Sequence, residues 1–470
     1  MAAAGRLFLA LFGSAGLLGG VFPAACGQPS GPAFERDLVL VSVDALRAGR
    51  LPLYGAARDT GGDPSQPWSL PWLASRGTTW ETAWAPAGKT VPSLATFWTG
   101  LPPLEHGAVS NNTPLNPSVA TLAERLHAQG FTTLARVANR SLAPVIGLAR
   151  GFDQYGLRFK EQEPRVGSDL LDLAAGPIGQ GKPLLLWAHF MAPHQPYTPV
   201  PPNDRRYAGA EGPPGDNETL YSLNRDPAKA TPEVVEHLRG LYDGEVRTAA
   251  GYVQKLLSGL DSLYRKAGRG GLLDNAVVVF FSDHGEELAD HHGYFMHAKS
   301  LYSGVIRIPL VMAGPGIPAG ARREDPIRMA DILPFVLEGK RPPPGPFFAT
   351  WKGKFFAVRE GPWTLIHNPC ADSKGPREPP LDGRFPYPEV ALFDRSSDPF
   401  EQRDVSHAHP EVTRRLLGAL DRWYAGLEFR EPGPIPGLDP ARRAQLEQLG
   451  YLGEDMENNA CVPWPAERWK

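Results

Sequence analysis

The chain has 470 residues, of which 42% are hydrophobic and 21% are charged. These fractions are close to those of globular proteins, so the composition excludes a chain that is disordered as a whole. The formal net charge of -3, from 48 Lys and Arg against 51 Asp and Glu, excludes the broad basic field that nucleic-acid binding normally needs. We therefore expect a folded protein with no nucleic-acid partner, in which any preference for anions is local.

Residues 1–26 have the anatomy of a signal peptide. An early Arg6 is followed by an apolar run and then by small residues that end at Cys26. The run is too short and too interrupted by glycine for a good membrane span. Cys26 after two alanines also resembles a lipoprotein cleavage box, although Pro23 stands where leucine is usual, so lipid attachment at Cys26 and simple cleavage both stay open. Either way, we expect an exported protein that is periplasmic, extracellular or lipid-anchored.

Short, largely apolar segments predict strands that are covered on both faces, and amphipathic segments between them predict helices. The expected strands are Asp37–Val43, Leu184–Phe190, Ala276–Phe281 and Ile308–Met312, and the expected helices are Ser118–Ala128 and Pro232–Gly259. This alternation predicts an α/β fold with a doubly wound, mostly parallel sheet flanked by helices.

The sequence changes in character after about residue 340. A run of prolines at 342–344 is followed by short strand-like segments and one helix, which predicts a smaller α+β domain. The expected elements there are strands at Phe355–Arg359, Trp363–His367 and Ala391–Phe393 and a helix near Pro410–Tyr424. The predicted organisation is a large α/β domain that carries the site over 35–340, the smaller domain over 341–430, and a tail over 431–470.

Polar residues follow two of the predicted strands directly. Asp44 follows the first strand, and the pair Asp283 and His284 follows the third. Functional groups in doubly wound sheets gather beyond the carboxyl ends of the strands, and two carboxylates with one imidazole suit a divalent cation. Taken singly, Asp44 could instead cap a helix and Asp283 could instead belong to a turn.

Thr90 precedes a helix-like run, Leu94–Gly100. Pro92 suits an early helical position, so Thr90 is expected just before a helix N-terminus. Free amides and the helix dipole at such a place favour a tetrahedral anion. The alternative is an ordinary Thr or Ser cap.

Histidines and lysines in loops could contact an anionic ester. They are His194, which follows the second strand, His297 and Lys299 in a loop rich in Gly, Tyr and Phe, and Lys89 beside Thr90. Such groups can hold an anion or protonate a leaving oxygen. For either histidine alone, the alternative is a structural hydrogen bond.

Taken together and in order, these segments resemble the sulfatase family of the alkaline phosphatase superfamily. The resemblance covers about residues 36–425. It rests on the blocks VSVDALRAGRLPLYG, TVPSLATFWTGLPPLEHG, WAHFMAPHQPY, VVVFFSDHGEELADHHGYFMHAKSLYSGVIRIPLVMAGPG, AVREGPWTLI and ALFDRSSDPFEQRDV. It implies an alkaline phosphatase-like fold and a metal-dependent hydrolase of sulfate or phosphate-type esters. The implied partner is an anionic ester, a sulfated or phosphorylated small molecule or glycan.

The resemblance also implies roles for individual residues. His194 and His297 match catalytic positions that touch the anion or the leaving group, and Lys299 is expected to bind the substrate there. Apart from the resemblance, Lys89 is a further expected substrate-binding cation. The implied metal ligands are Asp44, Thr90, Asp283 and His284, with Thr90 also as the nucleophile. One divalent metal ion is implied; manganese, zinc and magnesium suit this ligand set, and calcium suits it less.

Several residues depart from the family pattern. The Cys or Ser that is normally oxidised to formylglycine is Thr90 here, and the arginine that supports it is Leu94. Threonine cannot yield that aldehyde by the usual maturation, so formylglycine is not expected. Unmodified threonine acts as a nucleophile toward phosphate esters elsewhere in the superfamily, usually beside two metals. The spare ligands for a second metal are Asp290, His291 and His292, and further departures are Ala45, Gly49, Ala192 and Thr364.

Other readings of the chain stay open. A non-catalytic protein that uses this fold to bind an anionic glycan would also fit, because a fold does not fix a function. A threonine-dependent phosphoryl-group transferase of the cell envelope fits less well, since those relatives carry several membrane spans. Cys370 and Cys461 could form one disulfide or remain as two thiols.

Overall fold

The computed structural model describes residues 36–209, 211–291, 293–297, 300–369 and 388–434, and all of them belong to one compact unit that starts at Glu35. The signal segment 1–26, the three cysteines and most of the predicted tail lie outside the described residues. Among the described residues, no helix combines the length and the apolar character that crossing a membrane requires.

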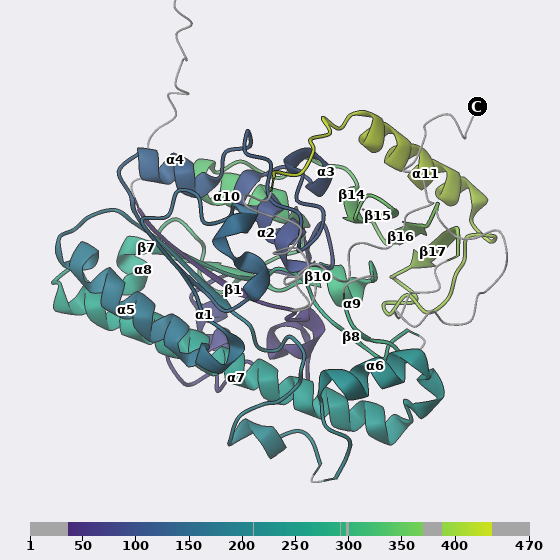
Figure 1. Cartoon of the computed structure of the whole chain (residues 1–470), viewed down its shortest axis with the longest axis horizontal. Coiled ribbons are helices and arrows are strands. Elements are labelled where there is room, and N and C mark those ends of the chain that lie inside the picture. The colour runs from purple at the N-terminus through teal and green to yellow at the C-terminus, as the bar shows by residue number, and fades with distance from the viewer. Residues whose placement is uncertain (1–35, 210, 292, 298–299, 370–387, 435–470) are drawn as a thin grey trace, which may run out of the picture. The chain divides into compact units, whose positions relative to one another are not determined.

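An eight-stranded sheet forms the main part of the structure (Figure 1). In spatial order its strands are β12 (Ala321–Arg323), β2 (Gly77–Trp80), β11 (Leu310–Ala313), β7 (Ala276–Ser282), β1 (Asp37–Val43), β6 (Leu184–Phe190), β4 (Thr132–Val137) and β5 (Gln154–Leu157). The five strands from β7 to β5 run parallel to one another, whereas β11 runs antiparallel to both β7 and β2. The prediction of a mostly parallel sheet is confirmed.

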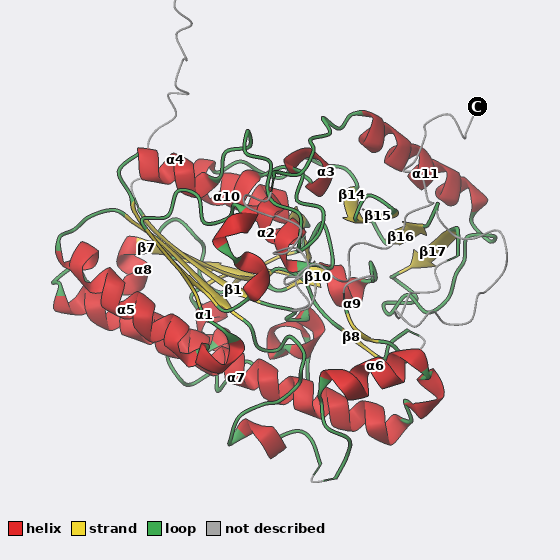
Figure 2. Cartoon of the chain, in the orientation of Figure 1, coloured by secondary structure: helices red, strands yellow, loops and turns green. Residues whose placement is uncertain are grey.

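Helices cover both faces of this sheet (Figure 2). The helices are α1 (Leu70–Ser75), α2 (Thr90–Thr99), α3 (Pro103–His106), α4 (Leu122–Ala128), α5 (Pro164–Gly179), α6 (Asn217–Arg225), α7 (Pro232–Lys266), α8 (Leu272–Asn275), α9 (Ser303–Ile306), α10 (Met329–Glu338) and α11 (Pro410–Ala425). On one face, Phe97 of α2 stacks on Phe281 of β7 with ring centroids 4.2 Å apart. On the other, Tyr252 of α7 stacks on Phe190 of β6 at 6.0 Å. Because β1, β6 and β7 are buried along their whole length, they appear in the sequence as continuous apolar runs.

Two predicted helix limits shift for local reasons. The helix α4 starts at Leu122 instead of Ser118, because Thr121 and Glu124 form a capping box there. The helix α7 continues beyond Gly259 to Lys266. A Cβ at Gly259 would lie 2.4 Å from a methyl group of Leu171 on α5. This glycine therefore allows two helices to approach closely and does not end the helix.

The predicted strand Ile308–Met312 is divided at Pro309. Residues Arg307–Ile308 form β10, which joins β3 (Ala83–Trp84) and β13 (Ile327–Arg328) in a small separate sheet. The remainder forms β11 of the main sheet. Proline has no backbone N–H to give to a ladder, so the chain changes sheets at that residue. A further short pair consists of β8 (Glu287–Leu288) and β9 (Phe295–Met296).

The C-terminal part contains a four-stranded antiparallel sheet. Its strands are β14 (Phe347–Trp351), β15 (Phe355–Glu360), β16 (Trp363–His367) and β17 (Val390–Asp394). Leu416 and Leu420 of α11 are buried against it. The strands and the helix expected in this region are therefore present within one or two residues, apart from β14, which was not expected. The boundary at 340/341 lies within the compact unit and stays a prediction.

Candidate functional site

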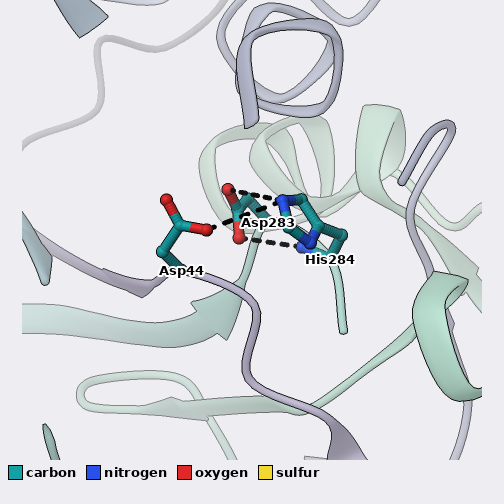
Figure 3. A group of neighbouring side chains, drawn as sticks. All are labelled: Asp44, Asp283 and His284. Carbon is teal, nitrogen blue, oxygen red and sulfur yellow. Dashed lines mark hydrogen bonds and ion pairs between the residues drawn. The ribbon is translucent and has the colours of Figure 1, made fainter. Parts of the chain in front are cut away.

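Two neighbouring parallel strands bring the predicted metal ligands together. In the register of β1 with β7, Val43 lies opposite Ser282, so Asp44 and Asp283 are the next residues beyond the carboxyl end of each strand. Asp44, Asp283 and His284 are all fully buried. One ligand atom from each lies within 4.8 Å of the other two, as Figure 3 illustrates.

Three atoms of this group have no hydrogen-bond partner although they are buried: Asp44 Oδ1, Asp283 Oδ2 and His284 Nε2. The nitrogen lies 3.6 Å from each of the two oxygens. The other atoms of the same side chains are satisfied: Asp283 Oδ1 accepts from two backbone N–H groups, and His284 Nδ1 lies 2.9 Å from the carbonyl oxygen of Gly285. Since a carbonyl only accepts, Nδ1 carries the proton and Nε2 keeps its lone pair.

Buried acceptors without a donor are rare, and three of them facing one another fit a divalent cation. The surroundings shift the pKa values of the two carboxyl groups in opposite directions. Burial, with the neighbouring charge of Asp44, raises the pKa of Asp283 well above its ordinary value. Burial opposes the charge of Asp44 as well, but His194, His189 and His284 outweigh it and hold the pKa of Asp44 well below its ordinary value. The residues present would therefore hold one cation between two carboxylates and an imidazole.

Thr90 lies beside this group and is fully buried. Its Oγ1 is 3.4 Å from Asp44 Oδ2 and 3.3 Å from Asn139 Nδ2. Thr90 is the first residue of α2, with Lys89 as the N-cap, instead of preceding the helix. The N–H of Val91 is already bonded to Asn111 Oδ1 at 3.0 Å. The N-terminus of α2 can therefore stabilise an anion through the helix dipole, but it has fewer free backbone N–H groups for an anion than the sequence suggested.

His194 and His297 meet on one side of the site. Their ring centroids are 4.9 Å apart, and the ring of His297 lies 4.3 Å from that of His284. Burial lowers the pKa of both rings, for His194 against the opposing effect of Asp44. Lys89 is also buried, 8% exposed, next to Thr90. Lys299 lies outside the described residues, so its predicted role is not placed.

Sequence reasoning missed three residues of this site. Asn139 follows β4 and donates to Asp44 Oδ2 at 2.5 Å. His189, on β6, lies 3.3 Å from the same oxygen, and Glu286 contacts His297 at 2.6 Å. The rule about carboxyl strand ends could have found Asn139. His189 had a signal as well, because it is the polar residue in the apolar run LLLWAHF.

The spare ligands suggested for a second metal are engaged elsewhere. Asp290 forms ion pairs with Arg47 and Arg239. His291 lies 3.0 Å from Glu287 Oε2 and 2.8 Å from the carbonyl oxygen of Phe400. Within the described ranges, the group at Asp44 is the one set of three such residues close enough to hold a metal. His292 lies outside those ranges.

Comparison with known proteins shows the family of this chain. A sequence profile described as "Sulfatase" matches residues 36–338. "Arylsulfatase K" of Rattus norvegicus is 22% identical over 414 residues, which cover 73% of this chain and 71% of the relative. A "multifunctional alkaline phosphatase superfamily protein" of Trinickia caryophylli is 28% identical over 186 residues, and the match spans about a third of each chain, 34%.

Solved structures show the same fold. The phosphonate monoester hydrolase of Agrobacterium radiobacter superposes with a TM-score of 0.60 at 18% identity, covering 83% of this chain and 95% of that chain. A structure described as a 2-O GAG sulfatase gives a TM-score of 0.58 at 19% identity, covering 85% and 97%. The prediction of an alkaline phosphatase-like fold is confirmed by both.

Proposed function

The chain belongs to the sulfatase family of ester hydrolases, and we propose that it is a metal-dependent hydrolase of sulfate or phosphate-type esters with Thr90 as its nucleophile. The observation that carries the proposal is the contact of Thr90 Oγ1 with Asp44, whose other oxygen is one of three unpartnered ligand atoms. Asp44 thus contacts the proposed oxygen nucleophile with one carboxylate oxygen and belongs to the set of possible cation ligands with the other. A decayed site that only kept the fold would have no need for this arrangement.

The bound cation would supply Lewis-acid stabilisation of the ester oxygens and a lower pKa for the threonine hydroxyl. Attack by Thr90 Oγ1 forms a bond to sulfur or phosphorus while the bond to the alcohol oxygen breaks. The balance requires one proton to pass from the hydroxyl to the departing alcohol. His194 and His297, whose rings lie 4.9 Å apart, are the residues that we propose for this transfer. Water then cleaves the ester on Thr90 and regenerates the hydroxyl.

An unmodified threonine agrees with the surroundings of this residue. Leu94, at the position of the arginine that supports formylglycine in the family, is fully buried in α2. Asn139 donates to both Asp44 and Thr90 and so fixes their relative positions. These contacts are compatible with a Thr90 side chain that is not chemically modified.

The proposed substrate is an anionic ester, on a small molecule or a glycan. One related structure holds a sulfated sugar, D-glucosamine-2-N,6-O-disulfate, and another is a phosphonate monoester hydrolase. Export, followed by cleavage or by lipid attachment at Cys26, belongs to the same proposal and rests on residues 1–26. The metal would be manganese, zinc, magnesium or calcium.

Matched substrates test this proposal. The purified protein is loaded in turn with each cation and assayed on an aryl sulfate, a phosphate monoester, a phosphate diester and a phosphonate monoester with the same aryl group. We expect turnover of at least one class that a chelator removes and that the cation restores. A correctly folded, loaded protein that binds sulfated glycans but hydrolyses none of the four classes would instead identify a glycan-binding protein.

A further inference from the structure

A second buried hydrogen-bonded group lies behind the metal ligands. Glu286, two residues beyond His284, is fully buried, and each of its carboxylate oxygens has one partner. Tyr197 donates its hydroxyl to Oε1 at 2.6 Å. His297 Nδ1 lies 2.6 Å from Oε2. Neither Glu286 nor Tyr197 has a role in the proposed reaction.

This contact determines which nitrogen of His297 is free. An imidazole ring can rotate and can exchange its proton between its two nitrogens, so a histidine acts on one defined atom only when the other atom is held. A short hydrogen bond of 2.6 Å to a buried carboxyl group holds a ring nitrogen in place. With Nδ1 held by Glu286, Nε2 is the nitrogen left to exchange a proton with the ester.

We propose that Glu286 is a positioning residue that fixes the ring of His297 through Nδ1, so that Nε2 passes the proton to the departing alcohol. This inference rests on the proposed function for the reaction itself. Tyr197 supports Glu286 from the opposite side, because its hydroxyl occupies the other carboxylate oxygen. The arrangement follows the general logic in which a third group orients a catalytic histidine.

The adjacent Glu287 provides a matched control. It is also fully buried and also paired with a histidine, His291, at 3.0 Å. Its other oxygen accepts the hydroxyl of Ser300 at 2.6 Å. Glu286→Gln and Glu287→Gln thus make the same chemical change in two neighbouring buried Glu–His pairs, of which only the first includes a histidine of the site.

Leaving-group dependence is the first measurement. Esters of one class are prepared with alcohols of rising pKa, and kcat/KM is measured for both variants. We expect Glu286→Gln to slow esters with poor leaving groups by about 10²- to 10⁴-fold and activated aryl esters by about tenfold or less. His297→Ala combined with Glu286→Gln should add little to either change alone, since both remove one function. Glu287→Gln should keep the wild-type dependence.

Nuclear magnetic resonance of ¹⁵N-histidine-labelled protein with Mg²⁺ is the second measurement, and it needs no activity. We expect a bonded Nδ1 proton of His297, assigned by its loss in His297→Ala, to be shifted or lost in Glu286→Gln and kept in Glu287→Gln. An unchanged His297 signal, or an equal loss of rate on all esters in Glu286→Gln, overturns the inference. If no ester is hydrolysed by the wild type, the proposed function fails, and the His297 signal alone decides whether Glu286 positions the ring.

Discussion

Thr90 differs from serine by one methyl group, and from cysteine by that methyl group and by oxygen in place of sulfur. Its Oγ1 contacts Asp44 and Asn139, while the residue as a whole is fully buried. Covalent catalysis needs the oxygen and not the methyl group. We expect Thr90→Ser to keep measurable turnover and Thr90→Ala to lose nearly all of it, by about 10³-fold or more.

Thr99, at the other end of the same helix, serves as the control for Thr90. Its hydroxyl bonds to the carbonyl oxygen of Ala95 at 2.7 Å, away from the site. Thr99→Ala should therefore leave the rate unchanged. Activity is measured on the ester class with the highest turnover, after circular dichroism confirms that each variant is folded. Full activity of Thr90→Ala would exclude direct attack by Thr90.

The unpartnered atoms of Asp44, Asp283 and His284 make metal binding measurable without a substrate. A cation that binds only the folded state stabilises it by about 2.7 kcal/mol at a hundredfold excess over Kd. We expect a saturating divalent cation to raise the melting temperature of the wild type. In Asp283→Asn this rise should disappear, because Oδ2 of Asp283 is one of the three unpartnered atoms that would bind the cation.

Asp290→Asn is the control for Asp283→Asn. Asp290 is paired with Arg47 and Arg239 and does not belong to the ligand group. Its variant should melt at a lower temperature in the absence of metal but should still respond to the cation. A melting temperature of Asp283→Asn that rises as much as that of the wild type would place the cation elsewhere.

Strand ends located only part of the site in the sequence, whereas Thr90 was predicted from a helix start and from the family resemblance. Asp44, Asp283 and His284 stand at the ends of continuous apolar runs, so the rule about carboxyl strand ends located them. Glu286 and His189 act through partners that lie far away in the sequence, since Tyr197 and Ser42 become their neighbours only through folding. The role of a buried polar residue depends on its hydrogen-bond partner, and sequence spacing does not reveal that partner.

The loop after β6 carries His194 and is held by a buried carboxyl group. Glu163 Oε1 accepts the N–H groups of Met191 at 2.7 Å and Ala192 at 2.9 Å, and Glu163 is 3% exposed. Burial raises the pKa of Glu163 from 4.5 to about 7, despite the opposing effect of its backbone partners. The folded protein thus binds this proton more tightly than the unfolded chain.

It follows that Glu163 contributes its full stability below pH ~4.5, and that this contribution is lost as the pH rises through about 7. Glutamine cannot ionise. The free energy of unfolding of Glu163→Gln, relative to that of the wild type, should therefore rise by about 2–3 kcal/mol from pH 5 to pH 8. Urea unfolding at the two pH values measures the difference. The exposed Glu161→Gln is the control and should show no such gain. A difference between Glu163→Gln and the wild type that does not change with pH would contradict the assignment.

Strands were predictable where a long apolar run is buried on both faces; the buried strands β2 and β4, which read GTTW and TTLARV, were not predicted. The central strands β1 and β6 match their predicted limits residue for residue. The outer strands were not found, because their sequences do not alternate or run apolar: β12 reads ARR and β5 reads QYGL with no residue fully buried. Strands at the edge of a sheet keep polar side chains toward water, so they resemble loops in the sequence.

The small antiparallel sheet is joined to the rest of the chain by a buried charge. Glu401 is 1% exposed and accepts from Ser303, through its N–H at 2.6 Å and its hydroxyl at 2.9 Å. It also accepts the hydroxyl of Thr364 on β16 at 2.6 Å and lies 3.4 Å from the guanidinium of Arg359 on β15. Ser303 begins α9, six residues after His297. The sheet is therefore linked to the segment that carries a histidine of the site.

This link predicts that the small antiparallel sheet and the main sheet unfold as one unit, although the sequence suggested two domains. Removing one partner of a buried ion pair costs about 3–5 kcal/mol because the other charge is left uncompensated, so Glu401→Ala should lose stability of that order. It should also split the single urea transition into two, since the sheet and the main unit then lose their shared buried contact. The exposed Glu389→Ala should stay within about 0.5 kcal/mol of the wild type. Tryptophan fluorescence and ester hydrolysis, followed together through the urea transition, measure both effects. Two separate transitions in the wild type would show that the small sheet folds independently of the site.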